Sequence, residues 1–185
     1  IGGPKVTKNK ILVDITRESN SSELSHYMDG ISSNINKLAP SDTVALNRLT
    51  SKMKIKVTIE KIKSILKESP GERIVVASQF GEHLLLIKDK ITGSQMVGSD
   101  ENEASVVLLD TSHIREGINL DQYTHMIFLD RHFDMEKNKQ VEGRITRLSS
   151  IENVCHIYHI QTNLIDSHID KIPVGMNHKI WNKIM

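Results

Sequence analysis

The stretch VVLLDTSHIREGINLDQYTHMIFLD, residues 106–130, encloses a polar segment between two apolar runs. The first run is Val106–Leu109 and the second is His125–Leu129. Strands that are buried on both faces have such continuous apolar runs, and they are typical of parallel sheets covered by helices. The polar segment then begins where a strand ends, which is where ligands of open α/β sheets bind. We therefore expect an α/β protein with a functional site after these strands.

Further strands and helices alternate on both sides of this stretch. Upstream, Arg73–Ala77 (RIVVA) predicts a strand, and Phe80–Ile87 predicts a helix. Downstream, a predicted helix over Glu136–Leu148 precedes a predicted strand over Val154–Ile160. This order indicates a doubly wound parallel sheet with helices on both faces.

The N-terminal part of the chain has mostly helical spacing. A short strand is predicted over Lys10–Ile15, followed by a helix over Glu23–Leu38. Pro40 ends that helix and opens another that runs to about Leu49, and a separate helix follows over Met53–Leu66. Ser69–Gly71 is a turn signal. The sheet is thus preceded by a mostly helical segment.

Composition excludes several classes of protein. The chain has 185 residues and a formal net charge of +1, which does not by itself indicate a nucleic-acid partner. One cysteine, Cys155, excludes an internal disulfide framework and favours an intracellular protein, nuclear or cytoplasmic. The nine histidines lack ligand spacing, so we expect no metal site. No apolar run is long enough for a membrane span, and the start at Ile1 looks like the edge of a fragment.

A row of polar side chains marks the predicted helix over Glu136–Leu148. Gln140, Arg144 and Arg147 are spaced by four and three residues, so they share one face. Two guanidinium groups presented this way suit a phosphate chain. The alternative is a pair of solvated arginines. Their position after two other polar strand ends favours a functional role.

These residues match the motifs of a known family. From Val107 to Ser150 the chain resembles, without a gap, the C-terminal lobe of superfamily-two helicase-like ATPases, and the resemblance is closest to Swi/Snf-type DNA translocases. Thr111–Leu120 resembles the family's motif five, Thr-(Arg/Lys)-Ala-Gly-Gly-Leu-Gly-Ile-Asn-Leu. Asp130–Met135 resembles its Asp-Ser-Asp-Trp-Asn-Pro element. Motif six, Gln-x-x-x-Arg-x-x-Arg, falls on Gln140, Arg144 and Arg147.

Other parts of the chain extend the resemblance or depart from it. Arg73–Phe80 resembles motif four, and Ser51–Met53 resembles the Ser-x-Lys that opens the preceding helix. Ile114 and Arg115 replace the paired glycines of motif five. The Ile87–Val106 region is shorter than in the family, so a helix there is expected to be reduced or lost. The resemblance implies an N-terminal attachment over 1–50 and a helicase C-terminal RecA-like lobe over 51–185.

The resemblance also implies a role for each site residue. Arg144 and Arg147 would be arginine fingers, with Arg147 the better candidate. Gln140, Gly117 and Asn119 would face the nucleotide. The implied contacts to nucleic acid come from Ser78, Gln79, Thr92, Thr111, Ser112 and Arg115.

The implied protein is the C-terminal motor lobe of an ATP-dependent nucleic-acid translocase or helicase, with double-stranded DNA as the favoured substrate. The chain has no Gly-x-x-x-x-Gly-Lys-(Ser/Thr) loop. ATP and Mg²⁺ would therefore be held mainly by an N-terminal RecA-like lobe, and this chain alone would be inactive. Two alternatives stay open: a lobe of a viral transcription or termination ATPase, and a degenerate lobe that acts as a nucleic-acid-binding or scaffolding module.

Overall fold

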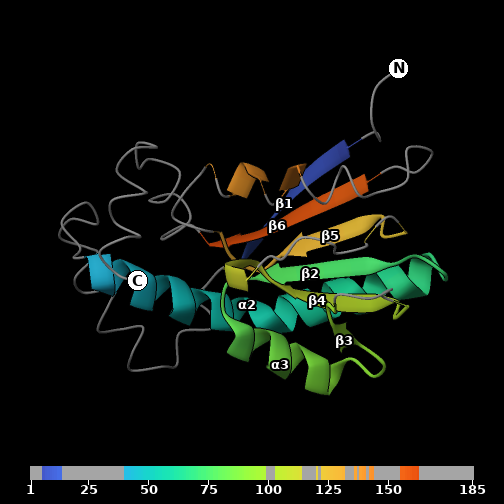
Figure 1. Cartoon of the computed structure of the whole chain (residues 1–185), viewed down its shortest axis with the longest axis horizontal. Coiled ribbons are helices and arrows are strands. Elements are labelled where there is room, and N and C mark those ends of the chain that lie inside the picture. Colours follow the sequence, from blue (N-terminus) through green and yellow to red (C-terminus); the bar gives the residue numbers. More distant parts are fainter. Residues whose placement is uncertain are drawn as a thin grey trace.

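One parallel sheet organises the chain. The computed structural model describes residues 6–13, 40–98, 103–113, 120, 122–131, 136, 138–140, 142–143 and 155–162. Within them the strand order is β1-β6-β5-β2-β4-β3, and every neighbouring pair is parallel (Figure 1). The strands are β1 (Val6–Val13), β2 (Ile74–Ser78), β3 (Gln95–Met96), β4 (Val106–Asp110), β5 (His125–Phe128) and β6 (Cys155–Thr162).

Two helices cover one face of this sheet. They are α2 (Pro40–Glu68) and α3 (Gly81–Lys90), which contact each other and lie side by side in Figure 1. Their apolar side chains pack on alternate residues of the central strands. That core comprises Leu46, Ile62, Ile65, Ile74, Val76, Leu84, Ile87, Ile91, Val106, Leu108, Ile127, Leu129 and Ile160.

The opposite face carries a second core and is covered by helical residues further along the chain. Residues 136, 138–140, 142 and 143 are helical, and the Glu142 carboxylate pairs with His159 of β6 at 2.9 Å. His159 lies on the same face as Ile157 because side chains alternate along a strand. The second core contains Val75, Ala77, Val107, Leu109, Leu120, Tyr123, Met126, Phe128 and Ile157. The expected RecA-like parallel sheet with helices on both faces is therefore confirmed.

The predicted break in the first long helix is wrong. The sequence suggested one helix ending near Leu49 and another starting at Met53, but α2 runs unbroken through both. No glycine or proline lies between Ser41 and Glu68, and the Thr50 hydroxyl is satisfied by the Asn47 carbonyl at 3.1 Å. The helix also crosses residue 50, where the expected attachment ends.

The other expected elements are found with small shifts. The turn at Ser69–Gly71 is present, and Gly71 has a positive φ of 93°, which glycine adopts without strain. After α3, the chain passes through a turn into the two-residue strand β3, which the sequence did not reveal. Between residues 91 and 106 the described residues contain no further helix, as expected. The predicted helix over Glu23–Leu38 lies outside the described residues. No described helix is both long and apolar enough to cross a membrane.

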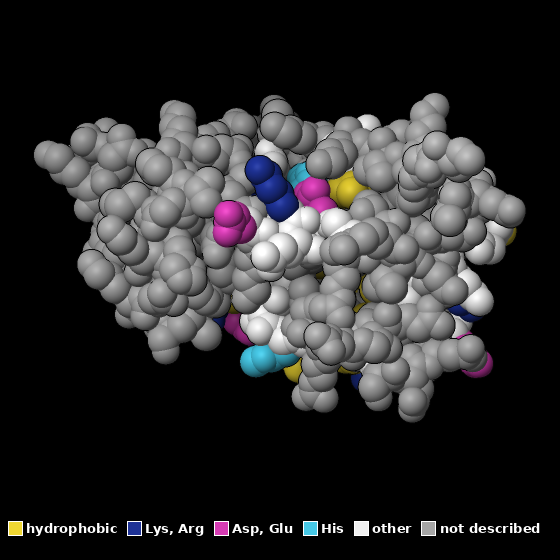
Figure 2. Space-filling model, turned by 45° about the horizontal axis from the view of Figure 1, so that its top comes forward, with side chains coloured by type: hydrophobic (Ala, Val, Ile, Leu, Met, Phe, Trp, Pro, Cys, Tyr) yellow, Lys and Arg dark blue, Asp and Glu magenta, His cyan; other side chains and the backbone are white. Residues whose placement is uncertain are grey.

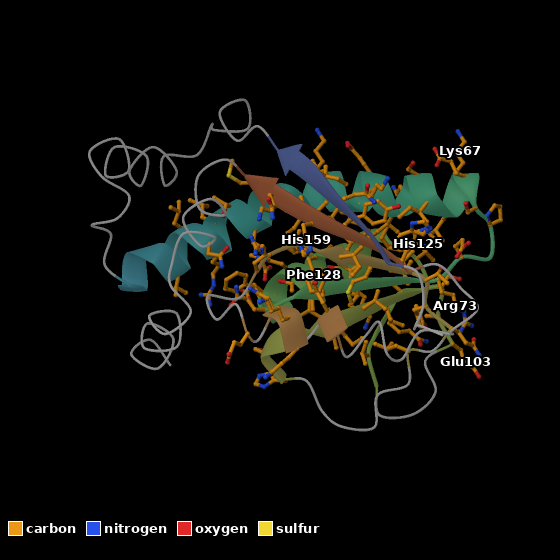
Figure 3. All side chains as sticks on the ribbon, turned by 90° about the horizontal axis from the view of Figure 1, so that it is seen from above. Lys67, Arg73, Glu103, His125, Phe128 and His159 are labelled. Atoms are coloured by element: carbon orange, nitrogen blue, oxygen red, sulfur yellow. The ribbon has the colours of Figure 1, made fainter. Side chains whose placement is uncertain are left out.

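Histidine rings stack at the amino edge of the sheet. The rings of His125 and His156 lie 4.8 Å apart, and Thr124 bonds to both Glu72 and His125. Figure 3 shows His125 at the end of the sheet opposite to Phe128 and His159. Burial lowers the pKa of His125 below its usual value; Glu72 opposes this shift, while His156 and Lys61 add to it.

This pKa direction predicts acid sensitivity. A depressed pKa means that the folded state binds fewer protons than the unfolded state below about pH 6.5, so stability falls as the pH drops through that value. We expect the free energy of unfolding, measured by urea titration from about pH 8 to about pH 5, to fall less steeply in His125→Asn than in the parent chain. The exposed Gln95→Ala, which changes no titratable group, should keep the parent's dependence. Identical slopes in all three proteins would contradict this role for His125.

Candidate functional site at the carboxyl edge of the sheet

The carboxyl ends of three central strands meet at one edge. Ser78 of β2 lies in register with Asp110 of β4, and Ala77 lies in register with Phe128 of β5. Parallel pairing places the residues that follow these strands side by side. Thr111–His113, a short 3₁₀ helix, continues from β4 at this edge.

A buried carboxylate, that of Asp130, joins the elements that meet here. Its Oδ2 accepts hydrogen bonds from the Ser51 hydroxyl of α2, at 2.7 Å, and from the Ser78 hydroxyl. Its Oδ1 accepts from the Gln79 backbone N–H at 2.9 Å. Asp130 is only 4% exposed. Residues 51, 78 and 130 are thus held at one point although they are far apart in sequence.

Burial disfavours the charged form of Asp130, and several hydrogen bonds and a nearby lysine favour it. Burial raises the pKa of this carboxyl above its usual value. The bonds from Gln79, Ser78 and Ser51 and the charge of Lys54 act in the opposite direction. Lys54 is fully buried in α2, one turn beyond Ser51. An ionised carboxylate only accepts hydrogen bonds, and all three partners of Asp130 donate to it. The hydrogen bonds therefore suit the ionised form of this side chain.

A second polar junction lies beside the first. The backbone carbonyl of Arg131 accepts hydrogen bonds from the Asn47 amide at 3.2 Å and from the Gln79 amide at 2.9 Å. Asn47 is fully buried, and its Oδ1 has no partner among the described residues. The loop after β5 is therefore held by side chains from both α2 and the end of β2.

Helix α3 joins the same network through His83. Its Nδ1 lies 3.1 Å from the Ser51 hydroxyl. Burial lowers the pKa of His83, partly offset by the nearby Asp130 carboxylate. Nearby on the surface, the Arg48 guanidinium lies 5.1 Å from the centre of the Phe80 ring and pairs with Glu82 at 3.2 Å. These contacts fix the start of α3 against α2.

The end of β4 has its own carboxylate. Asp110 accepts hydrogen bonds from the Ser112 backbone N–H, at 2.9 Å, and from the Ser112 hydroxyl. Its other oxygen lies against the first residue of α3, because a Cβ added at Gly81 would stand 3.3 Å from it. Thr111 is buried and Ser112 is half-buried. The loop after β4 thus begins from a fixed point beside α3.

The structure brings four of the predicted nucleic-acid contacts to this edge. Ser78, Gln79, Thr111 and Ser112 follow or end neighbouring strands here. Ser78 is fully buried, and its hydroxyl donates a hydrogen bond to Asp130. A phosphate could accept a hydrogen bond from this hydroxyl only by displacing the Asp130 carboxylate.

Two predicted contacts are not part of this group. Thr92 is exposed and precedes β3, whose Gln95 pairs with Val107 near the start of β4. Thr92 therefore lies at the amino edge, away from Ser78. Arg115 lies outside the described residues.

On the other face, the predicted nucleotide-facing helix is anchored to the sheet. His159 stacks on Phe128 with ring centres 5.0 Å apart and an angle of 10°, and it pairs with Glu142 (Figure 3). Gln140 is exposed on the same run of helical residues. Arg144, Arg147, Gly117 and Asn119 lie outside the described residues, so their roles stay predictions.

Charges of both signs mix on the described part of the upper face. Figure 2 shows a basic side chain close to acidic side chains and a histidine among the described residues there. This arrangement agrees with the net charge of +1.

Sequence reasoning missed the residues that hold the edge together. Asp130 was identified only as the first residue of a family element, and Lys54 was not singled out. No motif or spacing in the sequence identified Asn47 or His83 as part of the site. Ser51 and Lys54 are three residues apart and so share a helix face, which is the one pattern that could have indicated an inward polar pair.

Comparisons with known proteins agree with this architecture. Residues 88–149 match the family model of the helicase conserved C-terminal domain. The crystal structure of the C-terminal part of the Fun30 ATPase domain is similar, with a TM-score of 0.54 and 16% identity, over 69% of this chain and 51% of that one. The Sulfolobus solfataricus SWI2/SNF2 ATPase core domain gives a TM-score of 0.59 and 14% identity, over 86% of this chain and 40% of that one. No curated protein sequence matches the chain.

The fold is that of a RecA-like lobe. Over residues 88–149 the family model agrees with the resemblance to a helicase C-terminal lobe, and the two solved structures share the fold. The chain spans about half or less of the length of the two structures.

The Asp130 network predicts a large loss of stability when it is broken. Asp130→Ala would leave two hydroxyls, one N–H and the Lys54 charge without their buried acceptor, at a cost of about 3–5 kcal/mol in the free energy of unfolding. Asp130→Asn keeps the shape and one acceptor, so it should cost less. Urea titration measures both.

The exposed Asp89→Ala is the matched control, and its expected effect is within about 0.5 kcal/mol. If Asp130→Ala cost no more than Asp89→Ala, the buried network would not be what holds this edge.

Proposed function

We propose that this chain is the C-terminal motor lobe of an ATP-dependent nucleic-acid translocase or helicase, and that Arg144 and Arg147 act as arginine fingers on ATP held by a second lobe. The observation that carries the proposal is the anchored helix that bears motif six. Glu142 faces the sheet, where it pairs with His159, whereas Gln140 is exposed. Residues two apart on a helix point to nearly opposite sides.

The same helical spacing gives the two arginines their direction. Arg144 and Arg147 share the face of Gln140 on the helix that the sequence predicts. Glu142 pairs with the sheet and Gln140 is exposed, so an unbroken helix would direct Arg144 and Arg147 away from the sheet as well. A lobe that binds its own nucleotide would not need this outward row, whereas a lobe that completes a site on a partner does.

The proposed chemistry is stabilisation of charge on a phosphoryl group. ATP with Mg²⁺ would be bound mainly by the N-terminal lobe, and water attacks the terminal phosphoryl group there. A guanidinium supplied from outside stabilises the charge that develops and is worth about three to five orders of magnitude in rate. Gln140, Gly117 and Asn119 would contact the nucleotide or couple the two lobes.

Nucleic acid would bind at the carboxyl edge. Ser112 and Gln79 lie at neighbouring strand ends, next to Thr111 and Ser78, and phosphate oxygens would compete with Asp110, Asp130 and the Arg131 carbonyl for their hydrogen bonds. Hydroxyls and amides of this kind contact phosphates and carry no base sequence. We propose double-stranded DNA as the substrate because the motifs most resemble those of Swi/Snf-type lobes.

The finger assignment is tested in the full-length protein that contains both lobes. Arg144→Ala and Arg147→Ala should each lower the nucleic-acid-stimulated kcat of ATP hydrolysis by at least about tenfold, because each removes charge stabilisation from the transition state. Duplex DNA should stimulate the parent more than single-stranded DNA or RNA. The 185-residue chain alone should show no hydrolysis.

Lys139→Ala is the matched control, since Lys139 is an exposed cation on the same helix. It should keep the parent's rate. Rates that stay within about twofold in both arginine variants would reject the fingers and favour a binding or scaffolding module.

A further inference from the structure

A groove runs along the outer surface between α2 and α3. Its volume is about 690 Å³, within the range of about 300–1,000 Å³ typical of ligand sites. Ile55 and Ile59 of α2 and Leu86 of α3 supply its apolar part. The two isoleucines are four residues apart, so they form one strip along α2. The groove lies on the helix side of the sheet, away from the helix that carries Gln140.

The apolar part of this groove is open to water. Leu86 is 44% exposed, and Ile55 and Ile59 are partly exposed. Leu85, next to Leu86 on α3 but outside the groove lining, is 53% exposed. Leu85 and Leu86 are the large apolar side chains that stand out as exposed among the described residues. Clustered apolar exposure of this kind marks an interaction surface more often than scattered single residues do.

Lysines border the groove from both helices. Lys52, Lys56 and Lys63 come from α2, and Lys90 comes from α3, one turn beyond Leu86. All four are exposed. Two carboxylates, from Glu60 and Asp89, also line the groove. Four lysines against two carboxylates leave the groove positive in a chain whose total formal charge is only +1.

We propose that the groove binds an acidic amphipathic helix of a partner protein. The aliphatic side chains of that helix would rest on Ile55, Ile59 and Leu86, and its carboxylates would face the bordering lysines. A helix lying in an apolar groove is a recurring mode of peptide recognition, and complementary charge selects the partner. Duplex DNA matches the lysines but has no aliphatic side chains for the apolar strip.

This proposal does not depend on the arginine fingers. The groove uses none of the residues assigned to the nucleotide or to nucleic acid. Three lysines of α2, Lys52, Lys56 and Lys63, thus lie beside a partly exposed apolar strip.

The test uses the whole 185-residue chain and a fluorescein-labelled probe helix of about 16 residues, roughly four turns long. The probe carries leucines along one face and glutamates elsewhere, and a second probe carries lysines in place of the glutamates. Fluorescence anisotropy should show saturable binding of the acidic probe at micromolar concentrations and none of the basic probe. A labelled DNA duplex is measured in parallel.

Two groove variants and one control locate the binding. Lys56→Glu/Lys63→Glu and Leu86→Ser should each weaken binding of the acidic probe by about tenfold or more, since they remove the charge and the apolar contact respectively. Lys67→Glu/Lys88→Glu makes the same change in net charge at exposed lysines of α2 and α3 that do not line the groove, and it should leave the affinity within about twofold. Circular dichroism checks that each variant is folded.

Three results would overturn the proposal. The first is equal binding of the acidic and basic probes. The second is equal weakening by the groove charge variant and by its control. The third is a loss of duplex DNA affinity in Lys56→Glu/Lys63→Glu as large as the loss for the probe, which would assign the groove to nucleic acid.

Discussion

The buried carboxylate of Asp130 is the interaction on which the arrangement of the functional edge depends. It accepts bonds from Ser51 in α2 and from Ser78 and Gln79 at the end of β2. Burying one carboxylate costs several kcal/mol unless donors compensate, and here three donors and a buried lysine do so. Because those partners come from separate elements, the charge is satisfied only when α2, β2 and β5 are assembled together. The network therefore couples correct assembly of the edge to the placement of the loops that leave it.

Contacts extend from the Asp130 network to both faces of the sheet. On the helix side, His83 and Asn47 extend the network, so the starts of α3 and of the loop after β5 are fixed. On the other side, Phe128 lies two residues before Asp130 and forms the platform on which His159 stacks. His159 in turn pairs with Glu142. A short chain of contacts thus links the polar edge to the helix proposed to present the arginines, and a motor lobe needs such rigidity to place a charge beside a partner's nucleotide.

Much of the fold could be predicted from the sequence because its strands are continuous apolar runs. Val106–Leu109 and Arg73–Ala77 were located almost to the residue, and their polar ends indicated the functional edge. The two-residue strand β3 was missed because two residues carry no periodicity. The division of α2 was wrong because the sequence showed two separate runs of helical spacing, one ending near Leu49 and one starting at Met53. The hydroxyls of Thr50 and Ser51 between them are satisfied inside the protein, so the helix continues. Lys54 and His83 were missed because burial of a polar group depends on partners that lie far away in sequence.

The most direct test of the central claim is a structure of the two-lobed protein with ADP, Mg²⁺ and aluminium fluoride, a mimic of the phosphoryl group in transfer. The account predicts that a guanidinium nitrogen of Arg147 lies at hydrogen-bond distance, about 2.7–2.9 Å, from a fluorine of the mimic. It also predicts that Glu142 and His159 remain paired behind it. An Arg147 that faces solvent or the sheet while the nucleotide site is closed would contradict the claim that this lobe completes a partner's catalytic site.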